Sequence, residues 1–370
     1  MTKSMLIVTP QMEENSTGRT YALWMLAKSL GWNVRVLSYF GNEVWEPLQG
    51  TEFQTICDIR KLPSYRARVK DLAVEAKNYD LILAIKPLPK SLGLVLAARK
   101  RHKFPLLLDI DDPDLEARLD LNPLWRAFLW RVRFFIFWVR VRSIRSRMDL
   151  HRIVSNPVLQ NRYGGTLIPH ARQDNGPGTE SIGTAPTVTF VGTPRKHKGI
   201  DLLREAVAQL SDRGFRLKVT ATEPHDAHPW EDWIGTSTLD EGLKIVASAD
   251  IVVIPSRRTK DSIGQLPVKL VDAMMAGRAV IVSDVDPMPW AVGPQGAVFP
   301  DGDLKGLVNE LEMMADPERR NECGKRMRRR AIEIFEFHSL ANAFNQACES
   351  AMTTSATRKS KFSGKSSRTA

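Results

Sequence analysis

The chain has 370 residues, of which 43% are hydrophobic and 26% are charged. These are the values of a globular protein, and the length suits two domains of ordinary size. The three cysteines are far apart, which excludes a disulfide framework and a cysteine-bound metal. The net charge of +11 is concentrated in two segments, residues 121–150 and 351–370, and the rest of the chain is close to neutral. This distribution excludes a nucleic-acid-binding surface spread over the fold.

The N-terminus enters a short apolar run, Met5–Thr9, almost at once. No longer apolar stretch precedes a small-residue cleavage site, so the pattern does not predict a signal peptide. We therefore expect the protein in the cytoplasm.

Strands and helices are predicted to alternate through the first half, which is typical of βαβ units and a parallel sheet. The predicted strands of this half are Met5–Thr9, Trp32–Ser38, Leu81–Ile85, Phe104–Asp109, Arg152–Ser155 and Thr166–Pro169, with helices over Thr20–Leu30 and Ser91–Arg101.

The segment 172–186 is rich in glycine, proline and small polar residues, which indicates a linker. The alternation then restarts, with strands over Val188–Val191, Arg216–Thr220, Ile251–Pro255 and Ala279–Ser283 and helices over Ile200–Leu210, Leu239–Ser248, Val268–Ala276 and from about Leu304. We predict an N-terminal domain over 1–171 and a second domain over 187–335. A C-terminal helix over 336–352 would pack back toward the first domain, and a basic tail over 353–370 has the composition of disorder.

A basic turn follows the first strand of the second half. Arg195, Lys196 and Lys198 stand just before a helix, whose N-terminus presents unpaired N–H groups and the positive end of its dipole. Such a turn suits a phosphate or diphosphate. The alternative is a solvated basic turn. The segment has no GxGxxG, which disfavours a nicotinamide or flavin site.

A second informative segment is the loop and helix from Asp261 to Gly277. Lys269, near the start of the helix, can face a phosphate, while carboxylates accept hydrogen bonds from sugar or ribose hydroxyls. Asp272 could serve in this way, or it could be an ordinary acid near a helix N-terminus.

Together these segments resemble retaining GT-B glycosyltransferases of the large bacterial group 1, or family 4, type. The resemblance lies in Val191-Gly192 with Lys198-Gly199, in Asp261-Ser-Ile-Gly264, in Asp272-Ala-Met-Met-Ala-Gly277 and in Gly296–Gly302, and it extends more weakly over the first half. It implies two facing Rossmann-like domains with a cleft between them.

The resemblance also implies roles. Arg195, Lys198 and Lys269 would bind the donor diphosphate, and Asp261, Gly264, Gln265 and Asp272 would hold the donor sugar or ribose. Asp261 and Asp272 would also be catalytic residues, together with Asp111. No metal or other cofactor is implied beyond the nucleotide-diphosphate sugar, and the acceptor would be a glycan or a lipid-linked sugar on the first domain.

Three positions depart from the family pattern. Thr193 stands where the family carries an arginine, and Arg195 is the natural substitute. In the family the two acids are usually eight residues apart, and counting back eight from Asp272 reaches Gly264. Asp261 takes the role of the first acid only if residues 265–267 are a three-residue insertion. Asp111 stands in the register of a family histidine and is a candidate catalytic residue, or the acids around it form a capped turn before Pro113.

The segment 124–141 is the most hydrophobic in the chain, yet it carries four arginines. At about 2.5–3.5 kcal/mol each, these arginines disfavour a membrane span. Along the same helix, arginines seven apart share one face among aromatic residues, which favours contact with an anionic membrane surface. The membrane-contact residues would be Arg126, Arg133, Arg140 and Arg147. The alternative is a helix packed in the first domain, with its arginines paired to acids such as Asp109, Asp111 and Asp112.

The resemblance implies an enzyme of the hexosyltransferase type in bacterial surface polysaccharide or glycolipid synthesis. Two rivals stay open: a sugar-nucleotide epimerase, and a non-catalytic GT-B-like scaffold that docks on the membrane. A glycosidase is disfavoured because the cation-rich turn calls for a phosphorylated donor.

Overall fold

A computed structural model describes residues 2–114, 150–192, 194–260 and 262–363. The chain divides into two compact units, one formed by residues 1–171 with 340–370 and the other by residues 172–339. Among the described residues, no helix is long and apolar enough to cross a membrane.

The first unit is built on a seven-stranded parallel sheet with the order β3-β2-β1-β4-β5-β6-β7. Its strands are β1 (Ser4–Val8), β2 (Asn33–Ser38), β3 (Cys57–Ile59), β4 (Leu81–Ile85), β5 (Leu106–Ile110), β6 (His151–Val154) and β7 (Thr166–Leu167). The order reverses at β1, which pairs with both β2 and β4. Side chains at the carboxyl ends of β1 and β4 therefore lie where open α/β sheets bind ligands.

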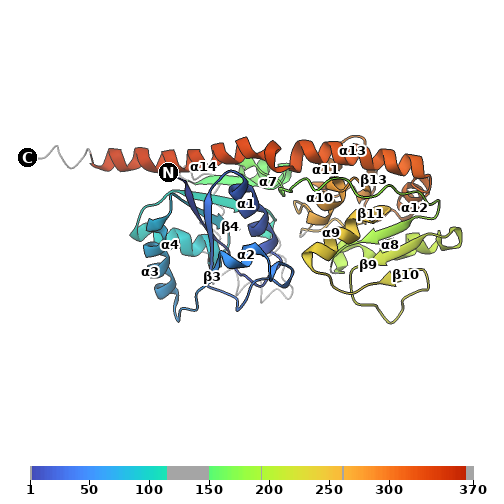
Figure 1. Cartoon of the computed structure of the whole chain (residues 1–370), viewed down its shortest axis with the longest axis horizontal. Coiled ribbons are helices and arrows are strands. Elements are labelled where there is room, and N and C mark those ends of the chain that lie inside the picture. Colours follow the sequence, from blue (N-terminus) through green and yellow to red (C-terminus); the bar gives the residue numbers. More distant parts are fainter. Residues whose placement is uncertain (1, 115–149, 193, 261, 364–370) are drawn as a thin grey trace, which may run out of the picture. The chain divides into compact units, whose positions relative to one another are not determined.

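Helices cover both faces of this sheet (Figure 1). They are α1 (Thr17–Ser29), α2 (Glu52–Thr55), α3 (Tyr65–Glu75), α4 (Leu94–Arg101) and α7 (Pro157–Tyr163), with 3-10 turns at Glu46–Leu48 and Ala76–Asn78 and a π-turn at Pro89–Gly93. The side chains of α3 and α4 pack on one face, against the strand positions occupied by Leu6, Val8 and Ile82. Every residue of β4 and β5 is buried, as expected for central parallel strands.

The second unit has a six-stranded parallel sheet with the order β10-β9-β8-β11-β12-β13. Its strands are β8 (Thr187–Phe190), β9 (Arg216–Val219), β10 (Glu231–Trp233), β11 (Ile251–Ile254), β12 (Ala279–Ser283) and β13 (Ala297–Phe299). Here the order reverses at β8, between β9 and β11. Two parallel Rossmann-like sheets confirm the predicted fold class.

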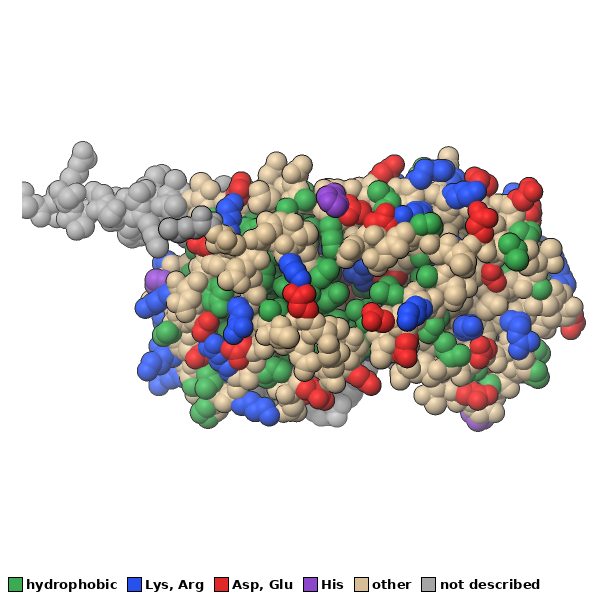
Figure 2. Space-filling model, viewed as in Figure 1, with side chains coloured by type: hydrophobic (Ala, Val, Ile, Leu, Met, Phe, Trp, Pro, Cys, Tyr) green, Lys and Arg blue, Asp and Glu red, His purple; other side chains and the backbone are tan. Residues whose placement is uncertain are grey.

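The helices of the second unit are α8 (Ile200–Ala208), α9 (Leu239–Ala247), α10 (Val268–Met275), α11 (Met288–Val292), α12 (Leu304–Met313) and α13 (Pro317–Phe335), with 3-10 turns at Lys196–Lys198 and Ser211–Arg213. The last helix, α14 (Phe337–Ser363), extends past residue 352, where we predicted its end. Within the first unit, Lys3 Nζ lies 3.0 Å from Glu349 Oε1 of α14, so this helix is tied to the start of β1. On the face that Figure 2 shows, basic and acidic side chains are interspersed.

Candidate functional site

The turn after β8 is shaped by two glycines. Gly192 has φ +131° and Gly199, the residue before α8, has φ +67°, a region that L side chains rarely adopt. A Cβ on Gly199 would lie 1.9 Å from the carbonyl oxygen of Pro255, the residue after β11. The turn therefore packs directly on the end of β11, at the point where the strand order reverses.

Two predicted diphosphate residues lie in this turn. Arg195 is exposed, and its carbonyl accepts a hydrogen bond of 2.7 Å from the backbone N–H of Lys198. The Lys198 ammonium donates to Gln265 Oε1 at 3.1 Å, which joins two predicted site residues 67 positions apart. Both cations stand at the N-terminus of α8, where the dipole and the unpaired N–H groups also favour an anion. Thr193 lies outside the described residues.

The loop before α10 carries the predicted sugar-side residues. Gly264 has φ +93°, and its N–H donates to the carbonyl oxygen of Asp286 at 2.9 Å. This contact fixes the loop that presents Gln265 to Lys198. Asp261, which we predicted as the first donor-side acid, lies outside the described residues, so its role stays a prediction.

Asp272 in α10 is enclosed by two cations. Its Oδ1 lies 2.6 Å from Arg172 Nε, and its Oδ2 lies 3.5 Å from Lys269 Nζ. The Asp272 side chain is 0% exposed, against 18% for Arg172 and 28% for Lys269. Burial would raise the pKa of Asp272, but Arg172 and Lys269 hold that pKa below its ordinary value. The buried carboxylate thus contacts two cations, and its role as an acceptor for sugar or ribose hydroxyls stays a prediction.

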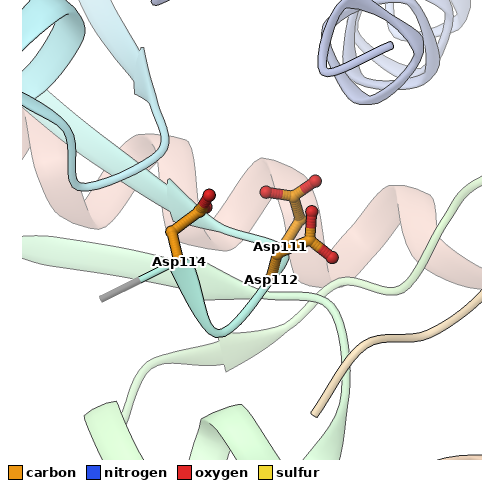
Figure 3. Close-up of side chains that lie close together, drawn as sticks. All are labelled: Asp111, Asp112 and Asp114. Carbon is orange, nitrogen blue, oxygen red and sulfur yellow. The ribbon is translucent and has the colours of Figure 1, made fainter. Parts of the chain in front are cut away.

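In the first unit, Asp111 belongs to a cluster of three carboxylates that project from the turn after β5 (Figure 3). Its members are Asp111, Asp112 and Asp114, whose oxygens lie within 4.8 Å of one another, a grouping able to hold a metal ion. The ammonium of Lys86 lies 3.0, 2.6 and 2.9 Å from these three residues in turn. Lys86 follows β4 with φ +62° and is buried. A cation is thus built into the cluster.

Asp111 is buried among these charges, and its pKa is shifted. Desolvation raises the pKa of Asp111 to about 8, and Asp112, Asp109 and Asp114 add to the increase, against the opposing effect of Lys86. Burial outweighs the attraction of Lys86, so Asp111 retains a proton near neutral pH. Asp111 can therefore donate as well as accept a hydrogen bond near neutral pH.

Sequence reasoning missed three residues of these sites. Lys86 carried a readable signal, because it follows a fully apolar strand at the carboxyl edge where the acids of the next strand also stand. Arg19 pairs with Asp109, and only the fold brings them together. Arg172 gave no signal, since it lies in the linker, 100 residues before Asp272.

The predicted membrane-contact residues lie outside the described residues. They are Arg126, Arg133, Arg140 and Arg147. The acids named as their alternative partners have other cations close by, Arg19 for Asp109 and Lys86 for Asp111 and Asp112.

The two parallel Rossmann-like sheets define a GT-B fold. Residues 185–316 match the family model "Glycosyl transferases group 1". A curated relative, an MMP alpha-(1->4)-mannosyltransferase of Mycolicibacterium hassiacum, is 33% identical over 162 residues, which are 39% of this chain and 38% of the relative. The chain thus spans under two fifths of the length of the curated relative it matches.

Solved structures show the same fold at low identity. The Anabaena protein HepE in complex with UDP-glucose has a TM-score of 0.71 at 14% identity, with 94% of this chain and 99% of that chain covered. A sucrose-phosphate synthase from Thermosynechococcus elongatus has a TM-score of 0.66 at 17% identity, with 93% and 98% covered. The lipopolysaccharide outer core galactosyltransferase WaaB has a TM-score of 0.62 at 12% identity, with 94% and 99% covered. The segment 185–316 thus matches the group 1 glycosyltransferase family, and the two sheets have the GT-B fold.

Proposed function

We propose that this protein transfers a sugar, with retention, from a nucleotide-diphosphate donor to a glycan or lipid-linked acceptor in bacterial surface polysaccharide or glycolipid synthesis. The observation that carries the proposal is the turn from Gly192 to Gly199. It presents Lys198 and Arg195 at the N-terminus of α8, inside the segment that matches the family.

Breaking the bond between donor sugar and diphosphate places negative charge on the leaving diphosphate. Lys198, Arg195 and Lys269, together with the N-termini of α8 and α10, would stabilise this charge as it develops. HepE is described in complex with UDP and with UDP-glucose, and this supports a nucleotide-sugar as the donor here. The name of the curated relative supports mannose as one donor sugar to test.

The acceptor side would lie in the first unit. Asp111, protonated near neutral pH beside Lys86, can orient an acceptor hydroxyl at the carboxyl ends of β4 and β5. We place the protein at the cytoplasmic face of the membrane, with the arginine-rich segment 124–141 as its anionic-lipid contact. Liposomes with and without anionic lipid, at low and high salt, test this placement.

The decisive experiment is calorimetric titration of UDP and GDP into the wild type, Lys198→Ala and Arg195→Ala. Each substitution should weaken binding by about 1.5–3 kcal/mol, the cost of a charge-assisted contact. Lys325→Ala, which removes an exposed ammonium from α13, is the matched control and should bind as the wild type does. Unchanged affinity in both site variants would remove the diphosphate assignment, and a wild type that binds neither nucleotide favours the non-catalytic scaffold. Nucleotide-sugar isomerised without acceptor would instead identify an epimerase.

A further inference from the structure

Four side chains meet at the carboxyl edge of the first sheet, where its strand order reverses. Gln11 follows β1, Phe40 follows β2, and Lys90 lies in the π-turn after β4; these three strands are neighbours in the sheet. Arg68, in the first turn of α3, completes the group. We call these four residues the Phe40 cluster. Open α/β sheets bind their ligands at this kind of edge.

The ring of Phe40 brings two cations together. The guanidinium carbon of Arg68 lies 4.6 Å from the ring centroid, and the ammonium of Lys90 lies 4.8 Å from it. Both distances are in the range of a cation–π contact. Phe40 packs against the core of the first unit, and its backbone N–H donates to Ser38 Oγ at 3.2 Å. The ring therefore has a fixed place, and both positive charges lie beside it.

The hydrogen-bond partners of both cations are neutral. Arg68 donates from Nε and Nη2 to the carbonyl oxygen of Leu62 at 3.1 and 2.9 Å, and Lys90 donates to Gln11 Oε1 at 2.5 Å. Within the part of the chain that the structure describes, neither cation forms an ion pair with a carboxylate, and Nη1 of Arg68 makes no hydrogen bond. The cluster thus presents two positive charges and N–H groups that are available to a ligand.

The acids closest along the chain are bound by other donors. Asp71, one turn further along α3, accepts hydrogen bonds of 2.8 Å from Tyr39 and from Arg60. Glu13, in the segment after β1, accepts from the backbone N–H of Asn42. These carboxylates therefore do not neutralise the Phe40 cluster, and an anion from outside the chain can do so.

We propose that the Phe40 cluster binds a phosphate group of the acceptor. Its two positive charges match the two negative charges of a phosphate monoester or a diphosphate, whereas a sugar carboxylate supplies only one. Arginine binds phosphate oxygens with directed N–H groups, and lysine adds a compact charge. This inference rests on the proposed function, which places the acceptor on the first unit, and it names a phosphorylated sugar or lipid as the acceptor class.

The position of the cluster agrees with the proposed acceptor site. Asp111, which we expect to orient an acceptor hydroxyl, follows β5, and β5 pairs with β4, the strand before Lys90. Asp111 and the Phe40 cluster therefore share one edge of one sheet. A single acceptor can present its hydroxyl to Asp111 and its phosphate to the cluster.

The test measures the binding of two phosphorylated probes, each beside its neutral counterpart. Glucose 6-phosphate is compared with glucose by calorimetric titration, and farnesyl diphosphate is compared with farnesol in phosphatidylcholine vesicles by cosedimentation. UDP is present at saturation, so that the donor turn around Lys198 is occupied. We expect the wild type to bind at least one phosphorylated probe more tightly than its neutral counterpart. The probe that binds shows whether a sugar or a lipid carries the phosphate.

The variants remove one charge at a time. Lys90→Gln and Arg68→Gln should each weaken binding of the phosphorylated probe about tenfold, with the affinities for UDP and for the neutral probe unchanged. Lys90→Arg keeps the charge and should keep most of the affinity. Because Lys90 is exposed, Lys90→Gln should fold even if Arg68→Gln does not. Lys70→Gln removes an exposed ammonium from the same helix as Arg68, and this matched control should bind as the wild type does.

Three outcomes would overturn the inference: phosphorylated probes bound no more tightly than neutral ones, unchanged affinity in both site variants, or an equal loss in Lys70→Gln. Each of these leaves UDP binding, and with it the proposed function, intact. A wild type that binds no UDP would instead overturn the proposed function. The same titrations without UDP then decide whether the Phe40 cluster binds phosphate.

Discussion

Arg19 of α1 and Asp109 of β5 form an ion pair that is sealed inside the first unit. Arg19 Nη2 lies 2.7 Å from Asp109 Oδ1, and their side chains are 1% and 0% exposed. The same guanidinium donates to the carbonyl oxygens of Ile168 and Pro169 at 2.8 and 2.7 Å. One side chain therefore joins α1, β5 and the segment after β7.

Removing the cation of this pair should destabilise the protein strongly. Arg19→Met leaves a buried carboxylate and two carbonyls without their donor, and we expect a loss of about 3–5 kcal/mol in the free energy of unfolding. Chemical denaturation measures it. Lys28→Gln removes the cation of an exposed pair with Glu52 and should change stability by less than about 1 kcal/mol. Similar losses in the two variants would contradict the structural role of Arg19.

Gly199→Ala should impair both stability and UDP binding. The left-handed conformation costs an alanine about 1–2 kcal/mol, and its Cβ would also collide with the carbonyl of Pro255. The collision displaces the turn that presents Lys198. Gly235→Ala is the control for the cost of the left-handed conformation alone. Gly235 also has a positive φ, +76°, but no atom lies within 4 Å of an added Cβ. Thermal melts and UDP titration of both variants check the difference, and equal behaviour would mean that the close approach to Pro255 is unimportant.

The central strands of both sheets were predictable from the sequence alone. β4, β5 and β12 are buried along their whole length and appear as continuous apolar runs. The outer strands β3 and β10 were missed, because their few residues are not consistently buried and they pair only once the neighbouring strand is in place. Helix α3 was also missed, since it buries few of its residues.

For the site, local sequence predicted the turn around Lys198 and the loop around Gln265, because glycine and cation patterns are local. The partners of Asp272 and Asp111 were not predictable in the same way. Arg172 and Lys86 reach them through the tertiary fold, and burial then alters the charge balance. An acidic residue that stands out in a sequence motif can therefore be buried against cations in the folded protein.

The raised pKa of Asp111 predicts how stability changes with pH. The folded protein keeps a proton on Asp111 up to about pH 8, whereas the unfolded chain releases it near the ordinary aspartate pKa of 3.8. Between these values the folded state binds more protons than the unfolded state, so this residue's contribution to stability falls as pH rises. Asp111→Asn removes that dependence. The melting temperature of the variant relative to the wild type should therefore increase steadily from about pH 4 to about pH 8.

Glu43→Gln, at an exposed position of the same unit, is the control and should track the wild type at every pH. A constant difference between Asp111→Asn and the wild type across this window would show that Asp111 is ionised throughout.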